Sequence, residues 1–324
     1  MEQKLRLLEM HFKYNEKAVC TINTLNLKHT DSEKLYKDFL HSEKGPRVKN
    51  TTRIEYIRNV PIIKFTPFDD IDFINHGFST RLGGVSEGIY KSLNLTFNLD
   101  DKKENVSKNF SIISEILNIP MSNMVYSKQT HTTNVIVVNK SHGGMGIVRP
   151  RSFDNVDGMI TDCSDLCLVT SYADCVPLFF VDPVNKCIGA SHSGWRGTVN
   201  NIAGNTIRLM QETFNTNPDD IKVFIGPSIC EDCYEVSYDV AGKFNDAYSP
   251  GQAAMIIRRG HTEGKYQLSL QKANYFNMIN AGIRPENIGI TDLCTCCNSD
   301  YLFSHRASKG KRGILCGFIY IRSK

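Results

Sequence analysis

The stretch LCLVTSYADCVPLFFVDPVNKCIGASHSG, residues 166–194, holds three short apolar runs separated by turn residues. Short apolar runs at residues 166–172, 176–182 and 186–194, each bounded by turn residues, are typical of β-strands. The segment IKVFIGPS, residues 221–228, has the same character. The sequence therefore predicts four strands in this part of the chain.

Helices are predicted between and around these strands. Apolar residues recur every three or four positions in ENVSKNFSIISEILN (104–118) and in GTVNNIAGNTIRLMQETF (197–214). A third helix is predicted near LSLQKANYFNMINAG (268–282), because Gly282 suits a helix end and Pro285 follows soon after. Alternating strands and helices predict an α/β fold, although the runs are too irregular for a simple doubly wound sheet.

The composition excludes several classes of protein. The chain has 324 residues, 41% hydrophobic and 22% charged, and no apolar run approaches the roughly 20 residues of a membrane helix. The net charge of +4, without a long basic run, argues against a nucleic-acid partner. Eleven cysteines in a chain whose start lacks the apolar core of a secretory signal predict reduced thiols or metal ligands. We therefore expect a cytoplasmic location.

The chain divides into two parts by composition. Residues 1–55 mix charged with scattered apolar residues, with a helix predicted within MEQKLRLLEM and a polar linker at HSEKGPRVKNTTR, residues 41–53. The regular pattern of strands and helices starts at residue 56. We therefore predict an N-terminal extension and linker over residues 1–55 and a single catalytic domain over residues 56–324.

Three residues are placed where they suit a catalytic or metal site: His131 in SKQTHTTN, Cys175 in SYADCVPLFF and His192 in GASHSGWRGT. The intervals between them are too long for a short-range metal motif, so their placement at strand ends and turns carries the argument. Neighbouring strands bring Cys175 and His192 to one edge of a sheet, where loops usually build sites.

Two histidines and one cysteine suit Zn²⁺, with a fourth position open for water or substrate, and Cu²⁺ is a credible substitute. Zinc would lower the pKa of a bound water to about 7. Two alternatives stay open. One is a buried thiol with two histidines bonded to the backbone, and the other is a nucleophilic pair with Cys175 attacking and His192 as its base.

Two segments are candidates for binding an anion. HGFSTRLGGVSEGIYKSLNL (76–95) surrounds Arg81 with hydroxyl donors such as Ser79, which suits phosphate, although the pattern by itself favours a tight surface turn with a solvated arginine. FSHRASKGKRG (303–313) is predicted to be a solvated charged loop except at Arg306, which we expect to assist an anionic ligand.

Two further patterns involve cysteine and aspartate. Two C-x-x-C pairs, residues 230–233 and 294–297, predict either a structural four-cysteine zinc site or packed thiols near the site, and the long separation of the pairs favours packed thiols. Asp154 and Asp157 in SFDNVDGMIT are predicted to form a turn before a strand rather than to bind a ligand.

Seven ordered blocks from about residue 70 to the C-terminus resemble the laccase-domain purine nucleoside phosphorylase family, also called the multicopper polyphenol oxidase family. They are HGFSTRLGGVS, the QTH around His131, DGMIT, ADCVPL, HSGWRGT, FIGPSI and the CYEV that starts at Cys233. The later CTCC and FSHR segments resemble the animal laccase domain-containing member more than the bacterial ones.

The resemblance implies a fold, a metal and an activity. The fold is a four-layer α/β/β/α sandwich. The family's zinc ligands fall on His131, Cys175 and His192. The implied activity is phosphorolysis of adenosine, inosine, guanosine and methylthioadenosine to the free base and a ribose 1-phosphate, with adenosine deamination beside it. We expect Arg81 to bind phosphate and Asp174 to act as an acid–base group in deamination.

Other classes of function compete with this one. The family's older name suggests a copper-linked polyphenol oxidase, but the chain has nine histidines and no H-x-H pair from which to build a laccase copper cluster. A cysteine-dependent hydrolase predicts inactivation by thiol alkylation and indifference to chelators. A non-catalytic scaffold would use the N-terminal extension for binding, and retention of all three metal ligands argues against it.

Overall fold

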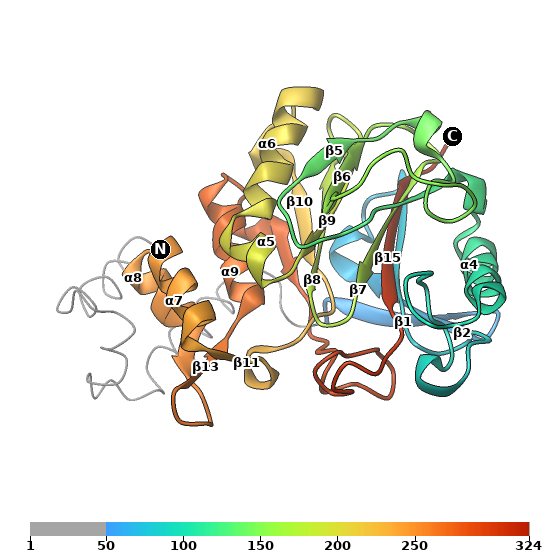
Figure 1. Ribbon diagram of the computed structural model, residues 1–324. Coiled ribbons are helices and arrows are strands. Elements are labelled where there is room, and N and C mark those ends of the chain that lie inside the picture. The colour runs from blue at the N-terminus through green and yellow to red at the C-terminus, as the bar shows by residue number, and fades with distance from the viewer. Residues whose placement is uncertain (1–49, 324) are drawn as a thin grey trace.

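The computed structural model describes residues 50–323, so the helix predicted within residues 1–10 lies outside the described part. Two six-stranded sheets form its centre (Figure 1). In spatial order the first sheet contains β1 (Thr52–Ile57), β2 (Val60–Phe65), β3 (Ile74–Ser79), β15 (Leu315–Ile321), β7 (Cys167–Tyr172) and β4 (Met124–Tyr126). The second contains β14 (Ile288–Ile290), β10 (Lys222–Ile225), β8 (Val176–Asp182), β9 (Cys187–Ser193), β6 (Gly158–Thr161) and β5 (Val135–Val137).

Helices cover the outer faces of both sheets (Figure 1). The helix α4 (Lys103–Leu117) packs its apolar face on the first sheet. On the second sheet lie α5 (Trp195–Val199), α6 (Ile202–Phe214) and α9 (Leu270–Asn280). Short 3₁₀ turns occur at Thr66–Phe68, Gly88–Tyr90, Met121–Asn123, Lys140–His142, Pro218–Asp220, Glu231–Cys233 and Pro285–Asn287. The mixed α/β class and the four-layer α/β/β/α sandwich are therefore confirmed.

The central core lies between the two sheets. Aromatic side chains from both sheets meet there, and the rings of Phe65 and Phe224 stack with their centroids 4.3 Å apart. Phe179 from the middle of the second sheet packs on the ring of Phe65. Burial of such large apolar side chains contributes about 1.5–3 kcal/mol each, so this packing holds the two sheets together.

The four strands predicted from the sequence are confirmed, and the structure adds where they lie. The strands β8 and β9 pair in antiparallel fashion, whereas β7 belongs to the other sheet. The chain therefore crosses from one sheet to the other at residues 173–175, where Asp174 adopts a left-handed backbone with φ of +87°. This crossover brings Cys175 to the edge of both sheets.

One predicted helix is interrupted. The segment 197–214 forms α5 and α6 rather than one helix, because Asn201 adopts the left-handed conformation with φ of +61°. The Asn201 side chain accepts a hydrogen bond from the backbone N–H of Gly204 and so begins α6. Asparagine tolerates this conformation because its short side chain bonds locally, a signal that apolar periodicity does not contain.

A third, smaller unit packs beside the second sheet (Figure 1). Its three strands are β11 (Glu235–Ser237), β13 (Lys265–Leu268) and β12 (Ile257–Arg259). The helices α7 (Tyr238–Ala247) and α8 (Pro250–Ile256) cover it. Its apolar residues are continuous with the core under α9. Among residues 50–323 every helix is too short or too polar to span a bilayer.

His76 makes the fold sensitive to acid. Its ring is buried in the central core, where Nε2 accepts the backbone N–H of Phe65, and burial holds its pKa well below the usual value of 6.5. In the unfolded chain His76 binds a proton near pH 6.5, whereas in the folded chain it stays neutral at that pH. The free energy of unfolding therefore falls as the pH falls below 6.5. We expect a loss of about 1.4 kcal/mol per pH unit from this group.

The measurement is urea unfolding at pH 7.5 and pH 5.5 for the wild type and for His76→Gln. Glutamine retains an acceptor for the Phe65 N–H and does not titrate. The wild type should therefore lose more stability than the variant between the two pH values. Equal losses would show that His76 does not sense pH.

Candidate metal centre

The three predicted ligands come together at the edge where the strands end. In the β8–β9 register Pro177 lies opposite His192, so Cys175 and His192 project from neighbouring strand ends. His131 arrives from the loop between β4 and β5 and has a left-handed backbone with φ of +64°. The candidate nitrogen and sulfur atoms of the three side chains lie within 4.8 Å of one another.

The distances fit a single metal ion. The Sγ of Cys175 lies 3.9 Å from Nε2 of His131, and the rings of His131 and His192 stand edge to face with centroids 5.0 Å apart. Zinc bonds of about 2.0–2.3 Å in a tetrahedron place nitrogen and sulfur donors about 3.6 Å apart. His192 is buried, Cys175 is half-buried and His131 is exposed, so the centre opens to solvent on the His131 side.

Asp157 organises the centre without being a ligand. Its carboxylate lies 2.8 Å from Nδ1 of His192, which leaves Nε2 of that ring for a metal. The same carboxylate accepts the backbone N–H groups of Thr130, His131 and Thr132 at 2.9–3.1 Å. One buried side chain therefore fixes both histidines. The predicted turn before a strand is confirmed, since β6 begins at Gly158, but sequence reasoning missed this positioning role.

Charge in the centre is shared between neighbouring groups. Burial alone would raise the pKa of the Cys175 thiol, but the charge of His192 and a hydrogen bond with His131 lower it to about 6. Burial would lower the pKa of His192, but the Cys175 charge and the Asp157 hydrogen bond raise it to about 9. Cys175 is therefore a thiolate at neutral pH, which is the form that binds metals or attacks a substrate.

Asp174, the expected acid–base group, lies next to Cys175 and has both carboxylate oxygens engaged. Oδ1 accepts the Thr295 hydroxyl at 2.6 Å, and Oδ2 accepts the backbone N–H of Arg306 at 2.7 Å. Its backbone carbonyl also accepts the N–H of Ile229. The side chain is buried, so it ties three loops to the edge of the centre.

The predicted phosphate residues Ser79 and Arg81 have partners of their own. The Ser79 hydroxyl is inside the first sheet, where it accepts the N–H of Cys316, and it has no exposed surface. Arg81 donates through its guanidinium to the carbonyls of Lys91 and Ser299 and packs over the ring of Phe303. Arg81 therefore joins the loop after β3 to the loop before β15. These two hydrogen bonds do not use the other N–H groups of its guanidinium.

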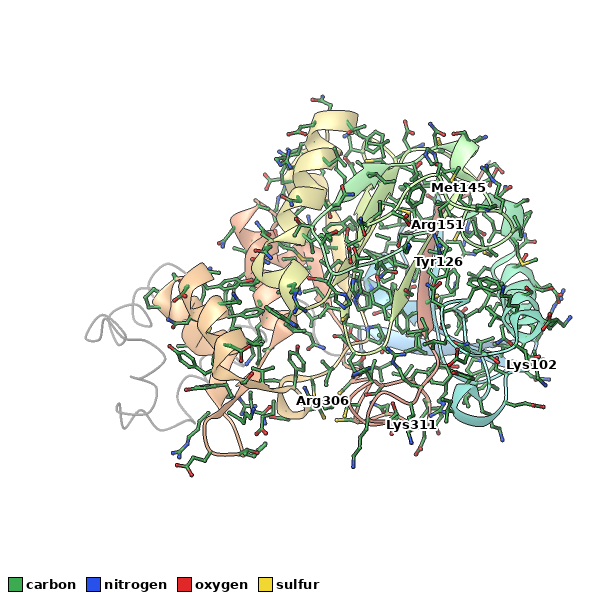
Figure 2. The ribbon with its side chains drawn as sticks, in the orientation of Figure 1. Lys102, Tyr126, Met145, Arg151, Arg306 and Lys311 are labelled. Carbon is green, nitrogen blue, oxygen red and sulfur yellow. The ribbon has the colours of Figure 1, made fainter. Side chains whose placement is uncertain are left out.

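Arg306 lies where the C-terminal loop meets the segment leading to β11 (Figure 2). Its guanidinium donates to the carbonyl of Cys233 at 3.2 Å and lies over the ring of Tyr234. In the same loop Arg312 is half-buried and interacts electrostatically with Asp174 and Cys175. Its Nε has no hydrogen-bond partner among the described residues. Sequence reasoning assigned Arg312 to a solvated loop, and the structure corrects this.

Gly194 is part of the centre because no side chain fits there. A Cβ at this position would lie 2.7 Å from Cδ2 of His131 and 3.1 Å from Sγ of Cys175. We expect Gly194→Ala to displace both ligands and to lower metal affinity and activity by at least about 10-fold. Metal analysis and rate measurements check this. Gly242→Ala is the control, since a Cβ there meets nothing closer than 3.8 Å. Unchanged metal content in Gly194→Ala would contradict the expectation.

Residues 75–322 match the family model described as multi-copper polyphenol oxidoreductase laccase. The chain belongs to this laccase family. The purine nucleoside phosphorylase YlmD of Bacillus subtilis is 34% identical over 245 residues, which cover 75% of this chain and 87% of that protein. The mouse purine nucleoside phosphorylase LACC1 is 29% identical over 280 residues, which cover 82% of this chain and 61% of that protein.

A solved structure has the same fold as this chain. The crystal structure of the hypothetical protein YfiH from Bacillus licheniformis superposes with a TM-score of 0.78 at 31% identity and covers 84% of this chain and all of that one. The family name refers to several coppers. Within residues 50–323, however, histidine enters only one cluster able to hold a metal, and that cluster contains two histidines and one cysteine.

Proposed function

We propose that this chain is a purine nucleoside phosphorylase that cleaves adenosine, inosine, guanosine and methylthioadenosine with phosphate. The convergence of His131, Cys175 and His192 within 4.8 Å carries the proposal, because it builds one complete centre from three separate segments. The names of relatives such as YlmD support the reaction class. The products are the free base and a ribose 1-phosphate.

The resident metal of the proposed enzyme is zinc, held by His131, Cys175 and His192. The donor set fits, since thiolate and imidazole are the ligands that zinc prefers, and the same set also suits Cu²⁺. When bound, zinc supplies a Lewis acid at the open side of the centre. Asp157 keeps the His192 ring in one orientation, and Gly194 leaves the room in which the ligands meet.

Phosphate is the second substrate and needs cationic partners. Arg306 and Arg312 are the arginines nearest to Asp174 on the C-terminal loop, and Arg312 has an unpartnered Nε among the described residues. One guanidinium group can donate two parallel hydrogen bonds to two oxygens of a phosphate. We therefore assign phosphate to this loop, with Arg81 as a supporting residue. Ser79 contributes by holding the strand beneath Arg81.

The proposed reaction exchanges one bond for another at the ribose. A phosphate oxygen bonds to C1′ while the bond from C1′ to the purine nitrogen breaks. The purine leaves with the bonding electrons and takes up a proton. The arginines hold the dianion against the ribose, and this positioning converts a bimolecular encounter into a reaction within one complex.

Adenosine deamination is the second proposed activity. Water adds at C6 of adenine and ammonia leaves, which requires a group that carries a proton between them. Zinc deaminases use a site of histidine and cysteine ligands with a nearby carboxylate for this purpose. Asp174 is the carboxylate beside Cys175, and we propose it for that role. Asp174→Asn should reduce deamination more than phosphorolysis.

The competing functions make different predictions. A cysteine-dependent hydrolase would use the same ion pair of Cys175 and His192 but would survive chelators. A polyphenol oxidase would need added copper and oxygen, and a scaffold would turn over nothing. Free cysteines fit a reducing compartment, so we propose that the enzyme acts in the cytoplasm on small molecules rather than on nucleic acids or membranes.

Product analysis by liquid chromatography tests the proposal. The purified protein is incubated with adenosine, with and without phosphate, and with and without a chelator. Free adenine that appears only with phosphate, and that the chelator abolishes, is the expected result. Inosine alone would make the protein a deaminase. Turnover of an amide or ester substrate that resists the chelator, or no product at all, would overturn the phosphorylase.

A further inference from the structure

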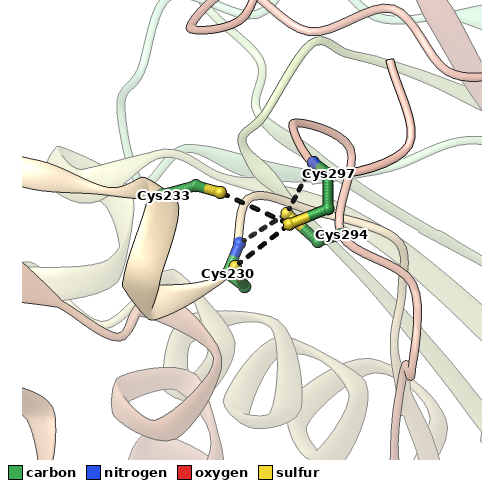
Figure 3. Close-up of side chains that lie close together, drawn as sticks. All are labelled: Cys230, Cys233, Cys294 and Cys297. Carbon is green, nitrogen blue, oxygen red and sulfur yellow. Dashed lines mark hydrogen bonds between the residues drawn. The ribbon is translucent and has the colours of Figure 1, made fainter. Parts of the chain in front are cut away.

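Four cysteine side chains from two distant loops converge beside the C-terminal loop (Figure 3). One pair consists of the N-cap and the last residue of the 3₁₀ turn Glu231–Cys233 that precedes β11, and the other pair lies after β14. All four sulfur atoms lie within 4.8 Å of one another. We call this group the four-cysteine cluster, which consists of Cys230, Cys233, Cys294 and Cys297.

The sulfur separations are those of a single tetrahedral ion. The Sγ atom of Cys297 lies 3.4 Å from that of Cys233 and 3.9 Å from that of Cys230. Four zinc–sulfur bonds of about 2.3 Å in a tetrahedron put each pair of sulfurs about 3.8 Å apart. An iron–sulfur cluster places several iron and sulfide ions between the cysteines, and so requires wider spacing. The cluster therefore has the dimensions of a mononuclear site.

We propose that the four-cysteine cluster binds one structural zinc ion, separate from the centre at Cys175. Four thiolates close the coordination shell, and a closed tetrahedral shell without a water position is the mark of structural rather than catalytic zinc. The two C-x-x-C pairs each supply two ligands from one tight turn. The pairs are about 60 residues apart in the chain, so the ion joins two segments that are distant in sequence and that an isolated β-bridge between Ser228 and Cys294 brings side by side.

The backbone around the cluster is arranged to stabilise the thiolate of Cys294. The N–H groups of Cys230 and Cys297 both donate to the Sγ of Cys294, at 3.2 Å and 3.4 Å (Figure 3). Hydrogen bonds donated to sulfur favour its charged form and orient it toward the metal. A set of merely packed neutral thiols would not need two backbone donors on one sulfur.

The turn that carries the first pair is anchored from outside. Glu231 forms ion pairs with Arg258 on β12 and with Lys272 on α9, the latter at 2.6 Å. The carbonyl of Cys233 accepts the guanidinium of Arg306. These contacts hold the turn in position before a metal binds, which reduces the loss of chain entropy on binding.

The cluster also supports the catalytic edge. Thr295, between the two cysteines of the second pair, donates its hydroxyl to Asp174, and Ile229, just before the first pair, donates its N–H to the Asp174 carbonyl. Asp174 precedes Cys175 in the chain. A metal that clamps both loops therefore fixes the backbone at Cys175 through two hydrogen bonds.

The test counts metal ions in the purified protein. The wild type should contain two zinc ions per chain, and Cys230→Ser/Cys297→Ser should contain one. Cys296→Ser is the matched control, since Cys296 is a neighbouring thiol outside the cluster, and it should retain two. Cys175→Ser should lose the other ion, which separates failure of this proposal from failure of the catalytic assignment.

A second measurement covers the case in which the double variant fails to fold. Cys175→Ser is reconstituted with Co²⁺ in place of zinc, so that only the four-cysteine cluster is loaded. Intense visible bands of a tetrahedral cobalt ion with thiolate-to-cobalt charge transfer are the expected spectrum. A zinc content that is the same in the wild type and in Cys230→Ser/Cys297→Ser, a spectrum without thiolate bands, iron in place of zinc, or a disulfide within the cluster found by mass spectrometry would each overturn the proposal.

Discussion

Cys175→Ser is expected to lose the proposed catalytic metal. The rates of phosphorolysis and deamination should both fall by more than about 100-fold, because removing even an outer partner of a metal ligand lowers metal affinity or activity by about 10–100-fold. The thiolate is the only soft ligand of the centre, and a serine hydroxyl neither ionises at neutral pH nor matches the zinc–sulfur bond length. The change is nearly isosteric, so the fold should persist. Metal analysis and product formation from adenosine measure the two losses.

Cys163→Ser is the matched control for this prediction. Cys163 is a free, half-buried cysteine that lies outside both clusters that could hold a metal, so its variant should retain metal and rate. A Cys175→Ser protein that kept full phosphorolysis would disprove the metal-centred account. One that lost activity but kept its metal would instead favour Cys175 as a nucleophile, as the hydrolase alternative requires.

Asp157→Asn is expected to lower metal affinity by about 10–100-fold, the usual effect of removing a partner that orients a histidine ligand. The carboxylate is fully buried and accepts three backbone N–H groups besides contacting His192. An amide presents an N–H₂ group where only acceptors fit, so stability should fall by about 2–3 kcal/mol. Metal titration and urea unfolding provide the two readouts.

Asp154→Asn makes the same chemical change three residues away. Asp154 is exposed and forms a surface ion pair with Lys128 at 3.1 Å, which contributes less than about 1 kcal/mol. This control should bind metal normally and unfold at nearly the wild-type urea concentration. If Asp157→Asn behaved like Asp154→Asn, then the histidines would be oriented by the loop alone.

Much of the fold could be predicted from local pattern. Strands β7, β8 and β9 are long apolar runs bounded by turn residues, and α4 has a regular apolar face, so periodicity alone placed them. The break between α5 and α6 could not be found in this way. It depends on the left-handed backbone of Asn201, and apolar spacing is blind to backbone conformation.

The three metal-ligand candidates could be predicted from the sequence, but the residues that surround them could not. Placement at strand ends and turns predicted His131, Cys175 and His192, and the structure brings all three together. Asp157 and Arg312 were assigned to a turn and a solvated loop. Their roles depend on partners 25 and more residues away, and a local pattern contains no information about such partners.

The α/β class, the main strands and the types of side chain available at each strand end follow from local sequence, because apolar periodicity and residue identity are local properties. Which of these side chains meet depends on long-range packing. The crossover from one sheet to the other places Cys175 opposite Gly194, and the pairing of β6 with β9 places Asp157 beside His192. The same holds for the four-cysteine cluster, since long-range packing, and not the spacing of its two pairs, brings four sulfurs to within tetrahedral reach.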